Sequence, residues 1–112
     1  MTPFLFTLCV LFGLLLAAGQ LLFKLAANGM DGLWSAATSP ALMAALALYA
    51  ATTALWIFIL TRLPLSTAYP FSLLGAALVP LMAHVAFGEV ISTKIVIGMV
   101  FVIIGLFVMY GL

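Results

Sequence analysis

Gln20 and Lys24 are polar residues that lie four positions apart near the end of the first apolar stretch. On a helix this spacing places them on one face, which Gly13 and Ala17 continue, with Gln20 about 6 Å deeper than Lys24. The Lys24 ammonium either attracts an anionic group such as a phosphate or simply extends to the lipid headgroups. A primary amide in hydrocarbon needs partners, so Gln20 either bonds to another helix or faces a hydrated groove.

Two later segments carry hydroxyl and aromatic side chains at helical spacing. The first holds Tyr49, Thr52, Thr53 and Trp56, and the second holds Tyr69 and Ser72 beside Pro70. Such residues anchor a helix at the membrane interface, join helices by hydrogen bonds, or line a substrate groove. The residue types alone leave these alternatives open.

The remaining polar residues predict no catalytic centre. His84 is the single histidine, so a metal site lacks a second ligand of this type. Glu89 and Asp31 fall in connections, where a solvated or capping carboxylate is expected, and Arg62 is placed to contact lipid headgroups. Because no phosphate loop, zinc motif or serine, histidine and acid set is present, we expect neither an enzyme nor a cofactor.

The composition predicts a membrane protein. Hydrophobic residues make up 69% of the 112 positions, and only three basic and two acidic residues are present. Soluble domains hold about 45–50% apolar residues, so most of this surface must face lipid. A net charge of +1 excludes an electrostatic nucleic-acid surface.

Four apolar runs predict four transmembrane helices, at residues 4–23, 42–60, 65–87 and 95–112. Backbone groups in lipid must be satisfied within the segment, which makes the fold all-α. Ser39 followed by Pro40 predicts the start of the second helix, residues 28–32 predict a turn, and Ser92 or Thr93 is a candidate cap for the fourth helix. The short connections predict an up-down bundle that forms one domain over residues 1–112.

The third helix carries two prolines. Pro70 and Pro80 each remove a backbone donor, which predicts a kink or hinge, and Gly75 between them permits close approach of a backbone or ligand. The alternative is that a membrane helix simply tolerates proline.

Gly98 and Gly105 are seven residues apart on the fourth helix. Two helical turns separate them, so they form one small-residue face on which a second helix can pack. Four helices have little room to enclose a pathway, which favours packing between chains in a dimer.

Several motifs make the chain resemble the small multidrug resistance family of the drug/metabolite transporter superfamily. They are "RLPLS" at 62–66, "AYP" at 68–70, "FGE" at 87–89 and "IGMVFVIIGLFVM" at 97–109. The resemblance implies four helices per subunit, a dimer through helix 4, and substrate held between helices 1 to 3. Gly98 and Gly105 match the helix 4 glycines of that family, and Tyr69 matches the tyrosine of its third helix.

The chain departs from the cation exporters of that family at two positions. Leu16 stands where they carry a membrane-embedded glutamate, and Ser72 stands where a tryptophan follows the tyrosine. The chain is more similar to the aminoarabinose-phosphoundecaprenol flippase subunits, which share "AGQ" at 18–20, the lysine at position 24 and the glutamate at position 89.

This resemblance implies a bacterial inner-membrane transporter of a polyprenyl-phosphate or other anionic lipid. Lys24 would hold the phosphate, and Gln20, Tyr69, Ser72 and Glu89 would complete the headgroup site. The expected partner is a second copy or a similar small subunit. Two alternatives are an exporter of quaternary cations or other small molecules and a subunit that does not itself transport.

Overall fold

The computed structural model describes residues 2–29 and 31–111, except for the side chains of Leu33 and Ala36. Every regular element in this part of the chain is helical, which confirms the all-α prediction. The elements are α1 (Pro3–Asn28), α2 (Leu33–Ala37), α3 (Pro40–Leu60), α4 (Leu65–Ala68), the 3₁₀ turn η1 (Tyr69–Phe71), α5 (Ser72–Phe87) and α6 (Thr93–Tyr110). Four helical runs are long and apolar enough to cross a membrane: α1, α3, Leu65–Phe87 and α6.

Hydroxyl side chains cap three of these helices. Thr2, Ser39 and Ser92 each accept a hydrogen bond from the backbone N–H three residues later, at 3.2 to 3.3 Å. Each bond satisfies an N–H group that the first helical turn leaves without a partner. The predicted start of α3 at Ser39 and Pro40 and the predicted Ser92 cap are therefore confirmed.

The end of the first helix differs most from the sequence prediction. The first helix continues to Asn28, five residues past the predicted end, so Lys24 lies inside a continuous helix. The reason is local, because residues 24–27 are all good helix formers, and glycine at 29 ends the helix. The short α2 occupies the following connection, and positions 30 and 112 of the predicted turn and fourth span lie outside the described residues.

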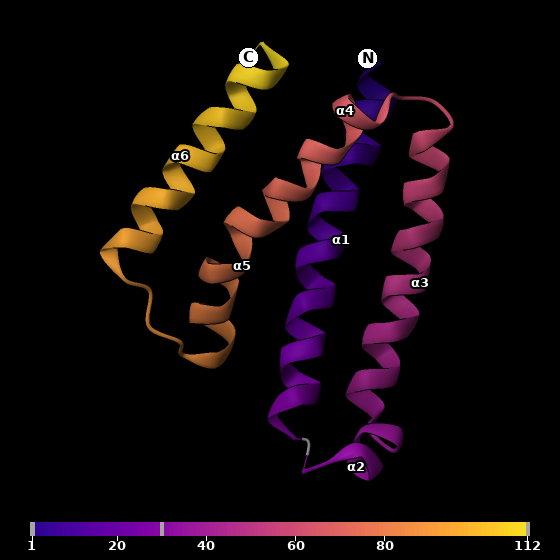
Figure 1. Cartoon of the computed structure of the whole chain (residues 1–112), viewed down its shortest axis with the longest axis vertical. Helices are drawn as coiled ribbons and strands as arrows, with labels where there is room; N and C mark the ends of the chain where they lie inside the picture. Colours follow the sequence, from indigo (N-terminus) through magenta and orange to yellow (C-terminus); the bar gives the residue numbers. More distant parts are fainter. Residues whose placement is uncertain (1, 30, 112) are drawn as a thin grey trace.

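The third span is interrupted where proline enters it. The α-helical geometry ends at Ala68, one 3₁₀ turn follows, and α5 begins at Ser72. Pro70 cannot donate to the carbonyl four residues earlier, and a tighter turn accommodates this loss. Pro80 lies inside α5 without ending it, and α5 runs obliquely in its upper part and more steeply below (Figure 1).

The four spans form an open layer. In Figure 1, α1 lies between α3 and α5, α6 stands beyond α5, and both termini lie at one end, as an up-down order requires. The chain extends 46 × 36 × 17 Å, and its short dimension is less than the thickness of two helices with side chains, each about 10–12 Å across. None of the α6 residues is buried.

Two glycines allow α1 and α5 to cross at close range. A Cβ atom added at Gly13 would lie 2.8 Å from the Phe71 carbonyl oxygen, and one added at Gly75 would lie 2.9 Å from the Gly13 carbonyl oxygen. The close backbone approach expected at Gly75 is confirmed. Next to this crossing, Cys9, Phe12 and Phe71 belong to the buried core, together with residues of α3 and α4.

Candidate functional site

A groove runs along α1, α3 and the third span and consists of three adjoining chambers. The upper chamber, of about 630 Å³, is lined by Trp56, Leu65, Ser66, Tyr69 and Pro70. The middle chamber, of about 250 Å³, is lined by Phe12, Leu16, Tyr49, Thr52, Thr53, Trp56, Tyr69 and Ser72. The lower chamber, of about 260 Å³, is lined by Leu16, Ala17, Gln20, Ser72, Gly75, Ala76 and Val79. Neighbouring chambers share lining residues, so we treat them as one groove.

The middle chamber collects the hydroxyl groups of α3. Thr52 is buried and donates its hydroxyl proton to the Leu48 carbonyl oxygen at 2.8 Å. Thr53 is exposed and donates in the same way to the Tyr49 carbonyl oxygen, also at 2.8 Å. Because each hydroxyl has a single proton, both oxygens keep only their acceptor capacity for a ligand.

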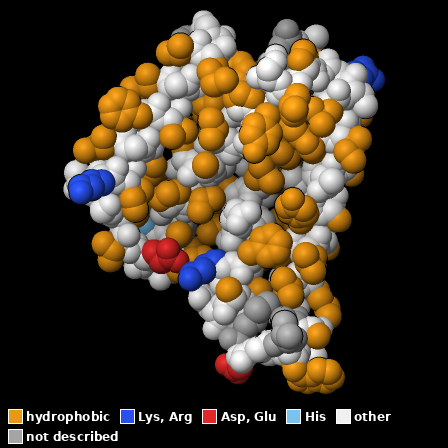
Figure 2. Space-filling model, viewed as in Figure 1, with side chains coloured by type: hydrophobic (Ala, Val, Ile, Leu, Met, Phe, Trp, Pro, Cys, Tyr) orange, Lys and Arg blue, Asp and Glu red, His pale blue; other side chains and the backbone are white. Residues whose placement is uncertain are grey.

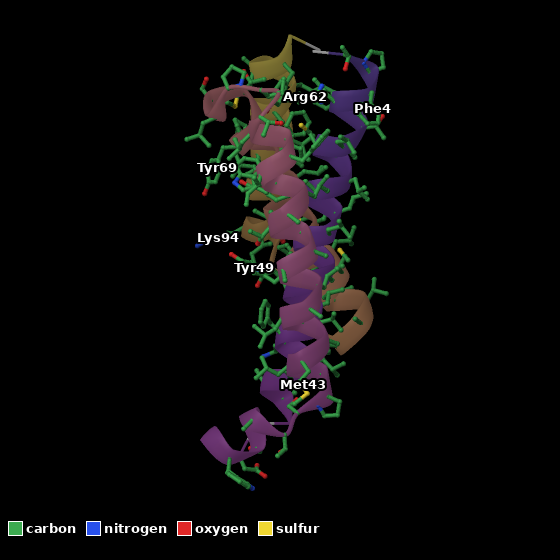
Figure 3. All side chains as sticks on the ribbon, turned by 90° about the vertical axis from the view of Figure 1, so that its right-hand side faces the viewer. Phe4, Met43, Tyr49, Arg62, Tyr69 and Lys94 are labelled. Atoms are coloured by element: carbon green, nitrogen blue, oxygen red, sulfur yellow. The ribbon has the colours of Figure 1, made fainter. Side chains whose placement is uncertain are left out.

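Aromatic rings form one wall of the groove. Trp56 stacks on Phe12 with ring centroids 4.6 Å apart and meets Tyr69 edge-on at 6.2 Å. Figure 3 shows Tyr49 and Tyr69 on the same side of the layer, with Phe4 on the opposite side. Tyr69 is 61% exposed, so its ring is available to a molecule in the groove.

Gln20 lines the lower chamber, and Lys24 lies one helical turn beyond it toward the end of α1. Both side chains are exposed, and the rise of about 1.5 Å per residue separates them by roughly 6 Å along the axis. A ligand in the lower chamber can therefore reach an amide first and an ammonium group one turn later.

The groove itself contains no charged lining residue among the described side chains. Figure 2 views this face and shows its few charged side chains toward the edges and the lower half. Leu16, which replaces the glutamate of the cation exporters, is shared by the middle and lower chambers. The carboxylate that would bind a proton or a cation is thus absent from a position that faces the groove.

Glu89 does not belong to these chambers. It is exposed in the connection between α5 and α6, where its backbone carbonyl oxygen lies 2.7 Å from Nδ1 of His84. Among residues 2–29 and 31–111, no three histidine, cysteine or acidic side chains gather as metal ligands. The structure therefore unites Gln20, Tyr69 and Ser72 along one groove and leaves Glu89 outside it.

The sequence prediction omitted part of the groove lining. The site residues that it selected omit Phe12, because a phenylalanine in an apolar helix looks like any lipid-facing residue. Phe12, Leu16 and Gln20 recur every fourth position, and this spacing is the pattern that would have linked them. The upper chamber depends on how the third span bends at η1, which places Ser66 opposite Trp56.

The glycine face of α6 lies apart from the groove. Gly98 and Gly105 are exposed, and a Cβ atom at either would meet no atom within 4 Å. Packing within this chain therefore does not account for the two glycines.

Comparison with known proteins found three similar relatives, each described as a "probable 4-amino-4-deoxy-L-arabinose-phosphoundecaprenol flippase subunit ArnE". Those of Aeromonas salmonicida and Aeromonas hydrophila are 36% and 35% identical in alignments 109 positions long, which cover 94% of this chain and 96% of each relative. The relative of Pectobacterium atrosepticum is 39% identical over 57 residues, which is 51% of this chain and 50% of that relative.

No family model and no solved structure matched the chain. The two Aeromonas alignments nevertheless cover 94% of the chain, which is too much to leave out any of the four spans. Relatives named as flippase subunits are transporters and not enzymes, and the chain has the spans of a multi-pass membrane protein. This chain belongs to the family of the ArnE flippase subunits.

Proposed function

We propose that this chain is a subunit of an inner-membrane transporter that moves a polyprenyl-phosphate-linked lipid between the two leaflets. The observation that carries the proposal is the uncharged groove with Lys24 one turn beyond its lower end. The relatives supply the cargo class, since they are named for 4-amino-4-deoxy-L-arabinose-phosphoundecaprenol. That lipid has an anionic phosphodiester, which a cation can hold, and a very long apolar tail.

In this proposal Lys24 holds the phosphodiester and Gln20 donates an amide hydrogen bond to it. Lys24 sits near the end of a span, where its stem can lie along apolar surface while the ammonium group stays near the headgroups. A hydrogen bond between charged partners is about twice as strong as one between neutral partners. Lys24 therefore supplies most of the affinity for the phosphate, and Gln20 orients it at the mouth of the groove.

The rest of the headgroup enters the groove, where Tyr69 and Ser72 bind it, and the tail stays in the bilayer. Glu89 lies in the connection on the same side of the membrane as Lys24, and we assign it to the entry of the headgroup. The layer is only 17 Å thick, so one chain leaves the groove open to lipid. A second copy or a similar small subunit would cover it.

The test is movement of labelled 4-amino-4-deoxy-L-arabinose-phosphoundecaprenol between leaflets of vesicles that contain the transporter, with any partner that co-purifies. Lys24→Ala is expected to weaken lipid binding by roughly tenfold to a hundredfold, because a charge-assisted bond is lost. Lys24→Arg keeps the charge and should retain part of the activity.

Lys94→Ala is the matched control. Lys94 is an exposed lysine in the first turn of α6, on the same side of the membrane, and it lines no chamber of the groove. Its replacement removes the same charge and should leave transport unchanged. Full activity of Lys24→Ala, or equal losses in the two variants, would overturn the assignment of the phosphate to Lys24.

A further inference from the structure

The threonine side of the middle chamber, formed by α3, has a chemical character that does not suit a phosphate. The hydroxyl protons of Thr52 and Thr53 are committed to backbone carbonyl oxygens, so their oxygens offer a ligand only lone pairs. A phosphodiester also offers only acceptors, and two acceptors facing each other repel. None of the described residues that line the chamber is a cation that would compensate for this repulsion.

The same chamber suits a headgroup that carries its own protons. Thr53 is exposed and lines the chamber, so a hydroxyl or ammonium group there can donate to the free lone pair of its oxygen. Trp56, one turn further along α3, and Tyr69 from the third span add ring surfaces to the same chamber, and aromatic faces attract cations as well as apolar C–H surface. Tyr69 and Ser72 can donate to sugar oxygens.

We infer that the middle chamber is the subsite for the sugar of a glycosylated polyprenyl phosphate, with Thr53 and Trp56 as its specificity-determining residues. Thr53 accepts a hydrogen bond from a hydroxyl or amino group of the sugar, and the Trp56 ring packs against the sugar. The phosphate stays outside, at Gln20 and Lys24. This inference rests on the proposed function and divides the groove into a sugar half and a phosphate end.

Trp56 lines the middle chamber, so its fluorescence can report on a ligand that binds there. The chain contains only Trp34 and Trp56, and Trp34 is 83% exposed on α2, away from the groove. In a Trp34→Phe background, fluorescence reports on Trp56 alone. The purified protein is titrated with 4-amino-4-deoxy-L-arabinose-phosphoundecaprenol and, separately, with undecaprenyl phosphate that lacks the sugar.

We expect the glycosylated lipid to bind more tightly and to change the Trp56 signal, whereas the bare lipid binds without that change. Thr53→Val keeps the shape of the side chain and removes the acceptor, so the sugar loses one hydrogen bond. Binding of the glycosylated lipid should then weaken on the order of tenfold, with binding of the bare lipid unchanged. Thr61→Val is the matched control, because the Thr61 hydroxyl makes the same kind of bond to a backbone carbonyl, that of Phe58, but lies outside the groove.

The outcomes separate this inference from the function on which it rests. If both lipids bind equally well, or if Thr53→Val weakens both or neither, the sugar subsite is overturned. The phosphate assignment survives that result as long as Lys24→Ala weakens the binding of both lipids. If neither lipid binds the unaltered protein, the proposed function fails and the sugar subsite fails with it.

Discussion

At the scale of single residues, Tyr110 at the end of α6 forms a hydrogen bond with a residue that is distant in the sequence. Its hydroxyl donates to the Thr67 carbonyl oxygen at 2.6 Å, and its ring lies against Phe71 with centroids 4.5 Å apart. Both partners belong to the segment where the third span changes from α4 to η1. A polar backbone group in the membrane needs a partner, and Tyr110 supplies one while it attaches α6 to the layer.

Tyr110→Phe tests this attachment. The substitution keeps the contact with Phe71 and removes one hydrogen bond, so the free energy of unfolding should fall by about 0.5–1.5 kcal/mol. Thermal unfolding of the purified protein in detergent measures the change. Tyr49→Phe is the control, because no hydrogen bond from the Tyr49 hydroxyl is present in the described part of the chain. A stability unchanged by Tyr110→Phe would mean that the ring alone holds α6.

At the scale of elements, α1 crosses η1 and α5 at close backbone distance. Gly13 and Gly75 face each other there, and neither position leaves room for a Cβ atom unless the backbones move apart. Membrane helices associate largely through such close packing, because lipid supplies no hydrophobic driving force between them. The crossing also sets the depth of the lower chamber, since Gly75 lines it.

Gly13→Ala should therefore separate α1 from η1 and lower the free energy of unfolding by roughly 1–3 kcal/mol. The carbonyl oxygen of Phe71 is backbone, so it cannot rotate away from the added methyl group as a side chain would. Gly19→Ala is the matched control, because Gly19 lies on the same helix and an added Cβ atom there meets nothing within 4 Å. Equal stabilities of the two variants would contradict the close crossing.

The elements show which parts of the structure can be predicted from local sequence. Ser39, Pro40 and Ser92 mark helix starts through their own chemistry, and apolar runs of membrane length mark the spans. The sequence placed Gly13 on the same face as Gln20, but only the structure shows that Gly13 packs under Phe71. Helical spacing says which residues share a face, whereas the identity of the facing neighbour depends on how separate helices pack.

The same distinction between shared faces and facing neighbours applies to the candidate site. An amide in hydrocarbon needs a partner, which predicts that Gln20 faces another helix or a groove, whereas the types of Tyr69 and Ser72 leave anchoring, helix contact and groove lining open. All three residues line the groove. Glu89 was selected through a family motif, and the structure places it in a connection outside the groove. Phe12 lines the groove and stacks on Trp56. This contact cannot be predicted from the residue type of Phe12 alone.

At the scale of the whole molecule, the layer is open on the side of α6. Every α6 residue retains exposed surface, and apolar hollows of about 200 and 330 Å³ lie between α6 and the rest of the chain. Helix α6 packs mainly against α5 and is tied down at its C-terminal end by Tyr110. A helix with so little internal packing is available to a helix of another subunit.

Gly98 and Gly105 predict where that helix packs, as they lie two turns apart on one face of α6. Gly105→Leu should prevent close approach and dissociate the oligomer, which native mass spectrometry measures as a fall in subunit number. No atom of the same chain lies within 4 Å of the new Cβ position, so the fold of the single subunit should be kept. Met99→Leu is the control. It places a leucine on the same helix but nearly conserves the side-chain volume, so it should leave the assembly intact.

If α6 packs against another subunit, Gly105→Leu should lower the subunit number and leave the helix content unchanged. Loss of the oligomer with an unchanged helical circular dichroism spectrum supports packing between chains, because the substitution then acts only where a second subunit is present. Transport should be lost together with the oligomer, since one open layer cannot shield a headgroup in the groove from hydrocarbon. An oligomer that tolerates leucine at position 105 would place the subunit contact on another face and leave the two glycines without a role in assembly.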